Sequence, residues 1–123
     1  MKALLSIKPE FAEKIFSGEK CFEFRKSAFC QEVTTIIVYA TAPVGRIVGE
    51  FEVARILEDA PHPLWEKTKR KAGITSAFFF DYFKGRKKAI AIEVSKPKKY
   101  KTALNPYEGG KKFHPPQSFR YLP

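Results

Sequence analysis

Apolar and polar positions along the chain recur with two different periods, and this separates strands from helices. Residues 2–7 form a short apolar run that predicts a strand. Phe11 and Ile15 stand four residues apart on the apolar face of an amphipathic helix. Pro9 fits the first turn of that helix and Gly18 fits the position just past its end. The first third of the chain is therefore predicted to begin strand, helix, turn.

The rest of the chain continues with strands and short helices. Strands are predicted over 20–25, 33–40, 44–57 and 87–95, and helices over 63–71 and from Thr75 to Gly85. In the longest strand Ile47, Phe51, Val53 and Leu57 alternate with the outward-facing Arg46, Glu50 and Glu52. Gly45 and Gly49 interrupt this strand, which predicts a bulge or bend as in a sheet curling toward a barrel.

The second of these helices carries five aromatic residues, Phe78, Phe79, Phe80, Tyr82 and Phe83. Such a cluster is more typical of a core than of a surface on which bases stack. The segment 96–123 holds five of the nine prolines, so we expect it to be extended, with its aromatic residues lying against the domain. With no internal repeat and no linker, the pattern predicts one α+β unit. Residues 1–95 are the expected domain, and 96–123 a proline- and lysine-rich extension packed on it.

The composition of the chain indicates which kind of partner the protein binds. With 123 residues and 44% hydrophobic residues the chain can bury a core without disulfides or a metal. Lys and Arg number 23 against 13 acidic residues, so the formal charge is 23 − 13 = +10. A pI near 9.7 is typical of proteins that bind nucleic acid. The alternative is a basic surface that only keeps the protein in solution.

The sequence gives little support for a disulfide framework, for a bound metal or cofactor, or for a membrane as partner. Cys21 and Cys30 are too few for a disulfide framework and are expected to be buried or half-buried thiols in a reducing, cytoplasmic environment. His62 and His114 stand far apart and outside any cluster of metal-ligating residues, so neither a metal nor another cofactor is predicted. No apolar run reaches the length of a signal core or membrane span, so a membrane is not an expected partner.

The candidate functional residues lie in the segment Gly18–Arg25. It contains three charged residues in and next to a predicted strand, namely Lys20, Glu23 and Arg25. Strand alternation places Glu23 and Arg25 on one face, and Lys20 lies at the junction of turn and strand, where alternation is less strict. One hypothesis is that Lys20 projects into a cleft whose wall carries Glu23 and Arg25. The other is an exposed strand on which Glu23 and Arg25 pair in solvent.

The surplus of positive charge falls into two stripes that flank the aromatic helix. The first comprises Lys67, Lys69, Arg70 and Lys71; the second comprises Lys84, Arg86, Lys87 and Lys88, followed by Lys96, Lys98, Lys99 and Lys101. Lysines outnumber arginines in these stripes, which favours contacts with a phosphate backbone over bidentate contacts with bases. Solvated faces without a partner are the alternative.

Several motifs resemble the ASCH domain of the PUA-like superfamily over roughly residues 2–95. They are the runs SIKPEFAEKI, GEKCFEFR with its Gly-x-Lys-x-x-Glu-x-Arg spacing, VYATAP and IVGEF. The resemblance implies a curled β-barrel with flanking helices and a cleft lined by the Gly-x-Lys-x-x-Glu-x-Arg segment. It also implies RNA binding. Two enzymatic branches are similar: small ribonucleases, and amidohydrolases that remove the acetyl group from N4-acetylcytidine.

The amidohydrolases match this chain at Gly18, Lys20 and Arg25 but have Thr in place of Glu23. They also use a glutamate near the later helix, and Glu66 is the nearest candidate here. We therefore expect an RNA-binding protein, or a sensor of a modified nucleoside. A hydrolase in which Lys20 and Glu23 are catalytic is the alternative.

The expected cleft residues are Lys8, Lys20, Glu23, Arg25 and Thr41, with Lys84, Arg86, Lys87 and Lys88 as further RNA contacts. Lys20 would meet a phosphate or carbonyl, and Glu23 would accept from a base or a 2′-hydroxyl. Arg25 would stack on a base or orient Glu23. Burial would lower the pKa of Lys20 and Glu23 would raise it, so the sequence leaves its role as a base open.

Overall fold

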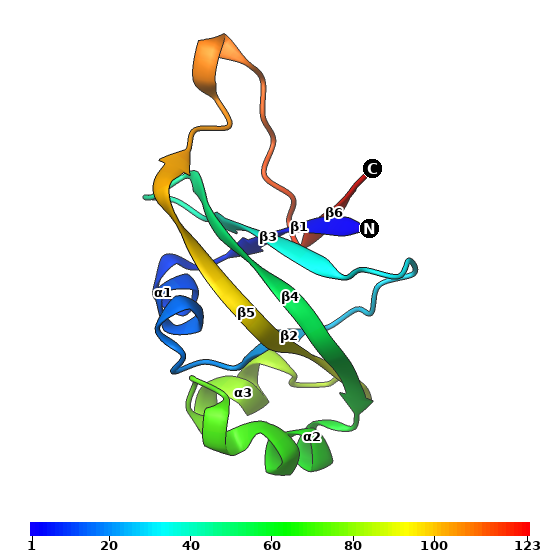
Figure 1. Ribbon diagram of the computed structural model, residues 1–123. Helices are drawn as coiled ribbons and strands as arrows, with labels where there is room; N and C mark the ends of the chain where they lie inside the picture. Colours follow the sequence, from blue (N-terminus) through cyan, green and yellow to red (C-terminus); the bar gives the residue numbers. More distant parts are fainter.

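The computed structural model describes residues 1–123 as a strongly curled six-stranded sheet with helices along one side and across one end (Figure 1). The elements in chain order are β1 (Lys2–Ile7), α1 (Pro9–Ser17), β2 (Phe22–Arg25), β3 (Thr35–Ala40), β4 (Arg46–Asp59), α2 (Pro61–Thr68), η1 (Lys69–Lys71), α3 (Ser76–Tyr82), β5 (Ala89–Leu104), η2 (Glu108–Gly110) and β6 (Phe119–Leu122). The strand order is β2-β5-β4-β3-β1-β6, with only β1 and β3 parallel. The predicted α+β class with a curled sheet is confirmed.

The first helix forms as its sequence predicts. Pro9 opens α1, and Gly18 ends it in the left-handed conformation with φ 87°. The N–H of Gly18 donates to the carbonyl of Ile15, which satisfies one of the free carbonyls at the helix end. Ala12 and Ile15 are the buried residues of the helix. This turn delivers the chain directly to Lys20.

The curl of the sheet arises where β4 pairs with β5. The register between them shifts at three places, one of them between Ile47 and Gly49, where the predicted bulge lies. A Cβ at Gly49 would lie 2.5 Å from the carbonyl oxygen of Lys98 and 2.5 Å from the ring of Phe16. Only glycine therefore lets α1 and β5 approach β4 this closely.

The two larger of the three apolar clusters in the fold lie next to the site. One lies beneath α1 and includes Leu5, Ile15 and Phe51. The other lies between β2 and the pair α2 and α3, and includes Phe24 and Phe79. The segment from Lys20 to Arg25 runs between α1 and α3 (Figure 1), so charged side chains there stand beside both clusters.

Several predicted elements differ in extent, and two of them change the picture of the fold. The helix expected over 63–71 begins at Pro61 and changes to the 3₁₀ turn η1 at residue 69. The strand expected over 87–95 starts at Ala89 and continues to Leu104, so residues 96–104 are paired strand within the expected extension. Lys98 stands opposite Glu50 in this pairing. Its many lysines hide the strand in the sequence, because their partners lie far away along the chain: Lys96 pairs with Glu52 of β4 and Lys99 with Glu13 of α1.

The end of the chain also belongs to the sheet. β6 pairs antiparallel with β1, which places the C-terminal residues beside the N-terminal strand. The expected division at residue 95 falls inside β5. Cys21 is half-buried as expected, whereas Cys30 is exposed, in a loop where burial was predicted. None of the helices has both the length and the apolar character needed to cross a bilayer.

Candidate functional site

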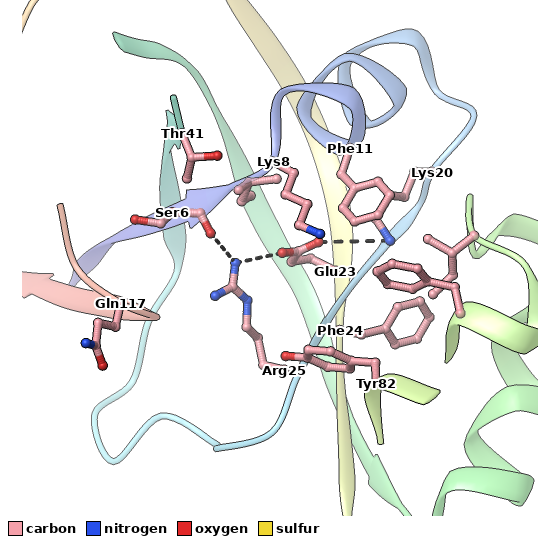
Figure 2. Close-up of a pocket in the computed structure, with 13 residues that line it drawn as sticks. Ser6, Lys8, Phe11, Lys20, Glu23, Phe24, Arg25, Thr41, Tyr82 and Gln117 are labelled. Carbon is pink, nitrogen blue, oxygen red and sulfur yellow. Dashed lines mark hydrogen bonds and ion pairs between the residues drawn. The ribbon is translucent and has the colours of Figure 1, made fainter. Parts of the chain in front are cut away.

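A pocket of about 360 Å³ opens between α1, β2 and α3 (Figure 2). All five side chains predicted from the sequence as cleft residues line it: Lys8, Lys20, Glu23, Arg25 and Thr41. Added to them are Ser6, Ile7, Phe11, Phe24, Ile74, Phe78, Tyr82 and Gln117. The pocket therefore combines a charged group with a largely apolar and aromatic wall.

Lys20 lies at the inner end of the pocket and is only 2% exposed. Its Nζ donates to the carbonyl oxygen of Ala72 at 3.0 Å and stands 3.9 Å from Oε1 of Glu23. The same ammonium lies 4.7 Å from the ring centroid of Phe24. A buried amine held by one carbonyl, one carboxylate and an aromatic face has few alternative positions.

Glu23 joins the two cations of the site. Its Oε2 accepts from Nη2 of Arg25 at 2.7 Å, while its Oε1 faces Lys20 (Figure 2). Glu23 is 6% exposed and Arg25 is 8% exposed. The hypothesis of a solvent-exposed pair on a strand surface is therefore wrong, because the pair is buried.

Arg25 ties the site to the two ends of the chain. Nη2 donates to the carbonyl oxygen of Ser6 at 2.8 Å, and Nη1 donates to the carbonyl and hydroxyl oxygens of Ser118 at 3.2 and 3.3 Å. The buried Nε has no hydrogen-bond partner. A guanidinium held at three places fixes the carboxylate of Glu23 rather than moving toward a ligand.

The environment of Lys20 changes its acid–base behaviour. Burial lowers its pKa from 10.5 to about 8, because the charged form loses its hydration. Glu23 opposes this by stabilising the ammonium, and the nearby cations Lys14 and Arg25 add to the lowering. Desolvation therefore outweighs the carboxylate, which answers the question that the sequence left open.

The aromatic helix has two faces. Phe79 and Phe83 are buried in the core, as expected for most of the cluster. Phe78 is 39% exposed and lines the pocket with Tyr82, four residues later on the same face of α3. The ring of Phe78 meets Phe11 edge-on at 5.4 Å, and the ammonium of Lys8 lies 5.6 Å from the centroid of Phe78. This accessible wall can receive a flat ring.

Gly73 gives the backbone room beside Lys20. Its φ is +69°, and an added Cβ would lie 2.5 Å from the Cβ of Lys20. Gly85 has a similar φ of +78° with no atom within 4 Å of its Cβ position. Both alanine substitutions incur about 1–2 kcal/mol of left-handed strain, but only Gly73→Ala also displaces Lys20.

We expect Gly73→Ala to lower the free energy of unfolding by at least about 1 kcal/mol more than Gly85→Ala. Urea denaturation of the two variants measures this difference. Equal losses would mean that the chain around Gly73 relaxes without disturbing Lys20.

Other predicted residues lie outside the pocket. Lys84, Arg86, Lys87 and Lys88 are exposed in the connection between α3 and β5 and do not line it. Glu66, the nearest candidate for the glutamate of the amidohydrolases, is exposed on α2 and pairs with Lys69 at 2.7 Å. The pocket therefore has Glu23 as its one carboxylate.

The C-terminal segment lies against the domain as predicted, but its contribution to the pocket was not predicted. Gln117 lines the pocket, Ser118 accepts from Arg25, and the hydroxyl of Ser6 donates to the carbonyl of Pro116 at 2.6 Å. The signal that could have located this wall is the aromatic pair Phe119 and Tyr121, which packs on Phe29 next to β1.

The chain is similar to known proteins over nearly its whole length. The ASCH domain matches residues 5–111. An ASCH domain-containing ribonuclease from Zymomonas mobilis is 32% identical over 124 residues, which cover 98% of this chain and 84% of that protein. The crystal structure of ASCH from Zymomonas mobilis superposes with a TM-score of 0.90 and 32% identity, covering 99% of this chain and 87% of that one.

The chain is also similar to part of a ribosomal protein. The large ribosomal subunit protein uL22 of Ureaplasma parvum is 30% identical over 122 residues. The match covers 97% of this chain but only 38% of that protein, so it concerns one part of it.

Proposed function

The chain belongs to the ASCH domain family, and from this membership and the chemistry of its pocket we propose that it binds RNA and cleaves it as a ribonuclease. The observation that carries the proposal is the position of Lys20: a buried amine with a pKa of about 8 at the inner end of an open pocket. A group whose pKa lies near the ambient pH is suited to accept and return a proton.

The partner follows from the two parts of the pocket. The exposed ring of Phe78 and the neighbouring Tyr82 offer an apolar face to a base, and stacking of bases on aromatic rings supports binding with little dependence on sequence. Lys8 is exposed at the same wall and offers its ammonium to a phosphate. With a net charge of +10 the chain attracts a polyanion from a distance.

RNA carries its own nucleophile, the 2′-hydroxyl, so a base that removes its proton is sufficient to start cleavage. In the proposed step neutral Lys20 accepts this proton, and the 2′-oxygen attacks the adjacent phosphorus. The bond to the 5′-oxygen of the next nucleotide breaks, and that oxygen takes a proton from water. The hydroxide that remains takes back the proton from the ammonium of Lys20, which restores the neutral base. The products are a 2′,3′-cyclic phosphate and a 5′-hydroxyl end.

Glu23 and Arg25 act through Lys20 in this scheme. Glu23 keeps the amine from losing its basicity altogether, since its carboxylate raises the pKa of Lys20 against the effect of burial. Arg25 orients Glu23, because its guanidinium is already held by Ser6 and Ser118. Of the two roles expected for Arg25, orientation fits its burial better than stacking on a base.

The exposed cations after α3 extend the binding surface. Lys84, Arg86, Lys87 and Lys88 follow Tyr82 of the pocket wall by a few residues. Arg86 is anchored by a 2.9 Å hydrogen bond to the carbonyl of Lys26. We assign these side chains to phosphates next to the bound base, as point charges that hold the strand without selecting its sequence.

We expect the purified protein to cut a labelled, mixed-sequence RNA and to leave 2′,3′-cyclic phosphate ends. The same oligonucleotide built from 2′-deoxynucleotides lacks the nucleophile and should remain intact while still binding. Mass spectrometry of the ends identifies the products. Ends that carry a 5′-phosphate would contradict the step. Release of acetate from N4-acetylcytidine, with RNA left intact, would replace the ribonuclease by an amidohydrolase.

A further inference from the structure

A second hollow lies next to the pocket, on the other side of the chain segment that carries Lys20. It measures about 430 Å³ and is lined by Cys21, Phe22, Arg55, Lys67, Thr68, Arg70, Lys71, Glu93 and Val94. We call it the basic groove. Four cations line it against one carboxylate, so its net charge is positive.

Only some of these cations have partners within the protein. Arg55 pairs with Glu93 at 2.9 Å, and Lys67 pairs with Asp59 at 2.9 Å. Arg70 and Lys71 are exposed and form no ion pair with an acidic side chain. Like charges gathered in one groove repel each other, and an anion bound between them removes this repulsion.

The groove and the pocket share a wall. Lys20 lines the pocket, whereas the next two residues, Cys21 and Phe22, line the groove. The backbone that follows η1 is bonded to the same wall: the N–H of Cys21 donates to the carbonyl of Lys71 at 2.8 Å, and Nζ of Lys20 donates to Ala72. The position of Lys71 is thus fixed relative to Lys20.

We propose that the basic groove binds the phosphodiester backbone of an RNA whose reacting nucleotide occupies the pocket. This inference rests on the proposed function, and it adds a second contact site that long RNA reaches and a dinucleotide does not. Arg70 and Lys71 hold the phosphates, because they are the cations of the groove without an internal partner. The groove thereby favours long RNA over short fragments.

The test compares two charge reversals of equal size. Arg70→Glu with Lys71→Glu alters the groove, and Lys111→Glu with Lys112→Glu alters an exposed pair in the loop at the opposite end of the molecule (Figure 1). We expect the groove variant to bind an oligonucleotide of about twenty nucleotides at least about tenfold more weakly than the loop variant at low salt. Its plot of log affinity against log salt should be shallower by about two. Cleavage of a dinucleotide should not change.

The oligonucleotide is measured as RNA, in a background of Lys20→Met that slows cleavage at least about 100-fold, and as single-stranded DNA, which lacks the 2′-hydroxyl and cannot be cleaved. Equal affinities and equal salt slopes for the two reversals would overturn the proposal. Loss of dinucleotide cleavage in the groove variant would overturn it too, since the groove would then not be a separate site. DNA binding that depends on Arg70 and Lys71, in a protein that cleaves no RNA, would uphold the groove and refute the ribonuclease.

Discussion

Replacing Lys20 with methionine is expected to lower the turnover of RNA by about 100- to 10,000-fold, the range that proton transfer by a positioned side chain contributes. Methionine has a similar length and no charge, and the Nζ that it replaces lies 5.4 and 4.7 Å from the ring centroids of Phe11 and Phe24. Glu23 keeps its ion pair with Arg25 at 2.7 Å, so the fold should tolerate the change, and binding of an uncleavable oligonucleotide should be largely retained. Initial rates under single-turnover conditions separate the loss of chemistry from a loss of binding.

The pH dependence tests the same role without a mutation. If neutral Lys20 is the base, kcat/KM rises with pH and levels off above about 8, where the amine has lost its proton. An ammonium that only holds a phosphate predicts the opposite, namely affinity that falls above about 8. Lys2→Met is the control, because Lys2 is exposed on β1, does not line the pocket and does not affect the pKa of Lys20. Turnover by Lys20→Met close to that of Lys2→Met would contradict a catalytic Lys20.

Much of the fold could be predicted because it is set by local patterns. Pro9, Gly18 and the spacing of Phe11 and Ile15 define α1, and Thr75 caps α3 by accepting from the N–H of Phe78. These features involve residues that lie within one or two turns of each other. They can be predicted from the sequence because the geometry of the helix itself fixes these contacts.

What could not be predicted depends on long-range pairing. β6 is recognisable only by its partner β1, more than a hundred residues earlier, and the lysine-rich half of β5 is recognisable only by its pairing with β4. The same limit applies to the site. The motif from Gly18 to Arg25 located the charged residues, but their burial results from α1, α3 and the segment near Ser118 closing around them.

The functional consequence of this closure is the pKa of Lys20. On an open strand Glu23 would keep the ammonium charged, and Lys20 could serve only as an anchor for an anion. Burial lowers the pKa of Lys20 to about 8, because the charged form loses more hydration than the carboxylate returns. A fraction of the amine is then neutral near physiological pH, which the proposed role as a base requires.

The buried charges also make Glu23 the most sensitive position for stability. Glu23→Gln leaves the ammonium of Lys20 and the guanidinium of Arg25 without a countercharge at 2% and 8% exposure. Removing one partner of a buried ion pair costs about 3–5 kcal/mol, mostly because the remaining charge stays desolvated. We expect a loss of that size in the free energy of unfolding, measured with urea near neutral pH.

A matched control and a double mutant distinguish the loss of a buried countercharge from the general cost of replacing a glutamate with glutamine. Glu93→Gln removes a carboxylate from the neighbouring strand β5, where its partner Arg55 has a side chain that is 63% exposed, so we expect a loss of at most about 1 kcal/mol. The double mutant Lys20→Met with Glu23→Gln lacks the ammonium of Lys20, so only the guanidinium of Arg25 remains buried without a countercharge. The double mutant should therefore be more stable than the sum of the two single changes predicts. If Glu23→Gln costs no more than Glu93→Gln, or if the two changes simply add, the three charges do not act as one buried network.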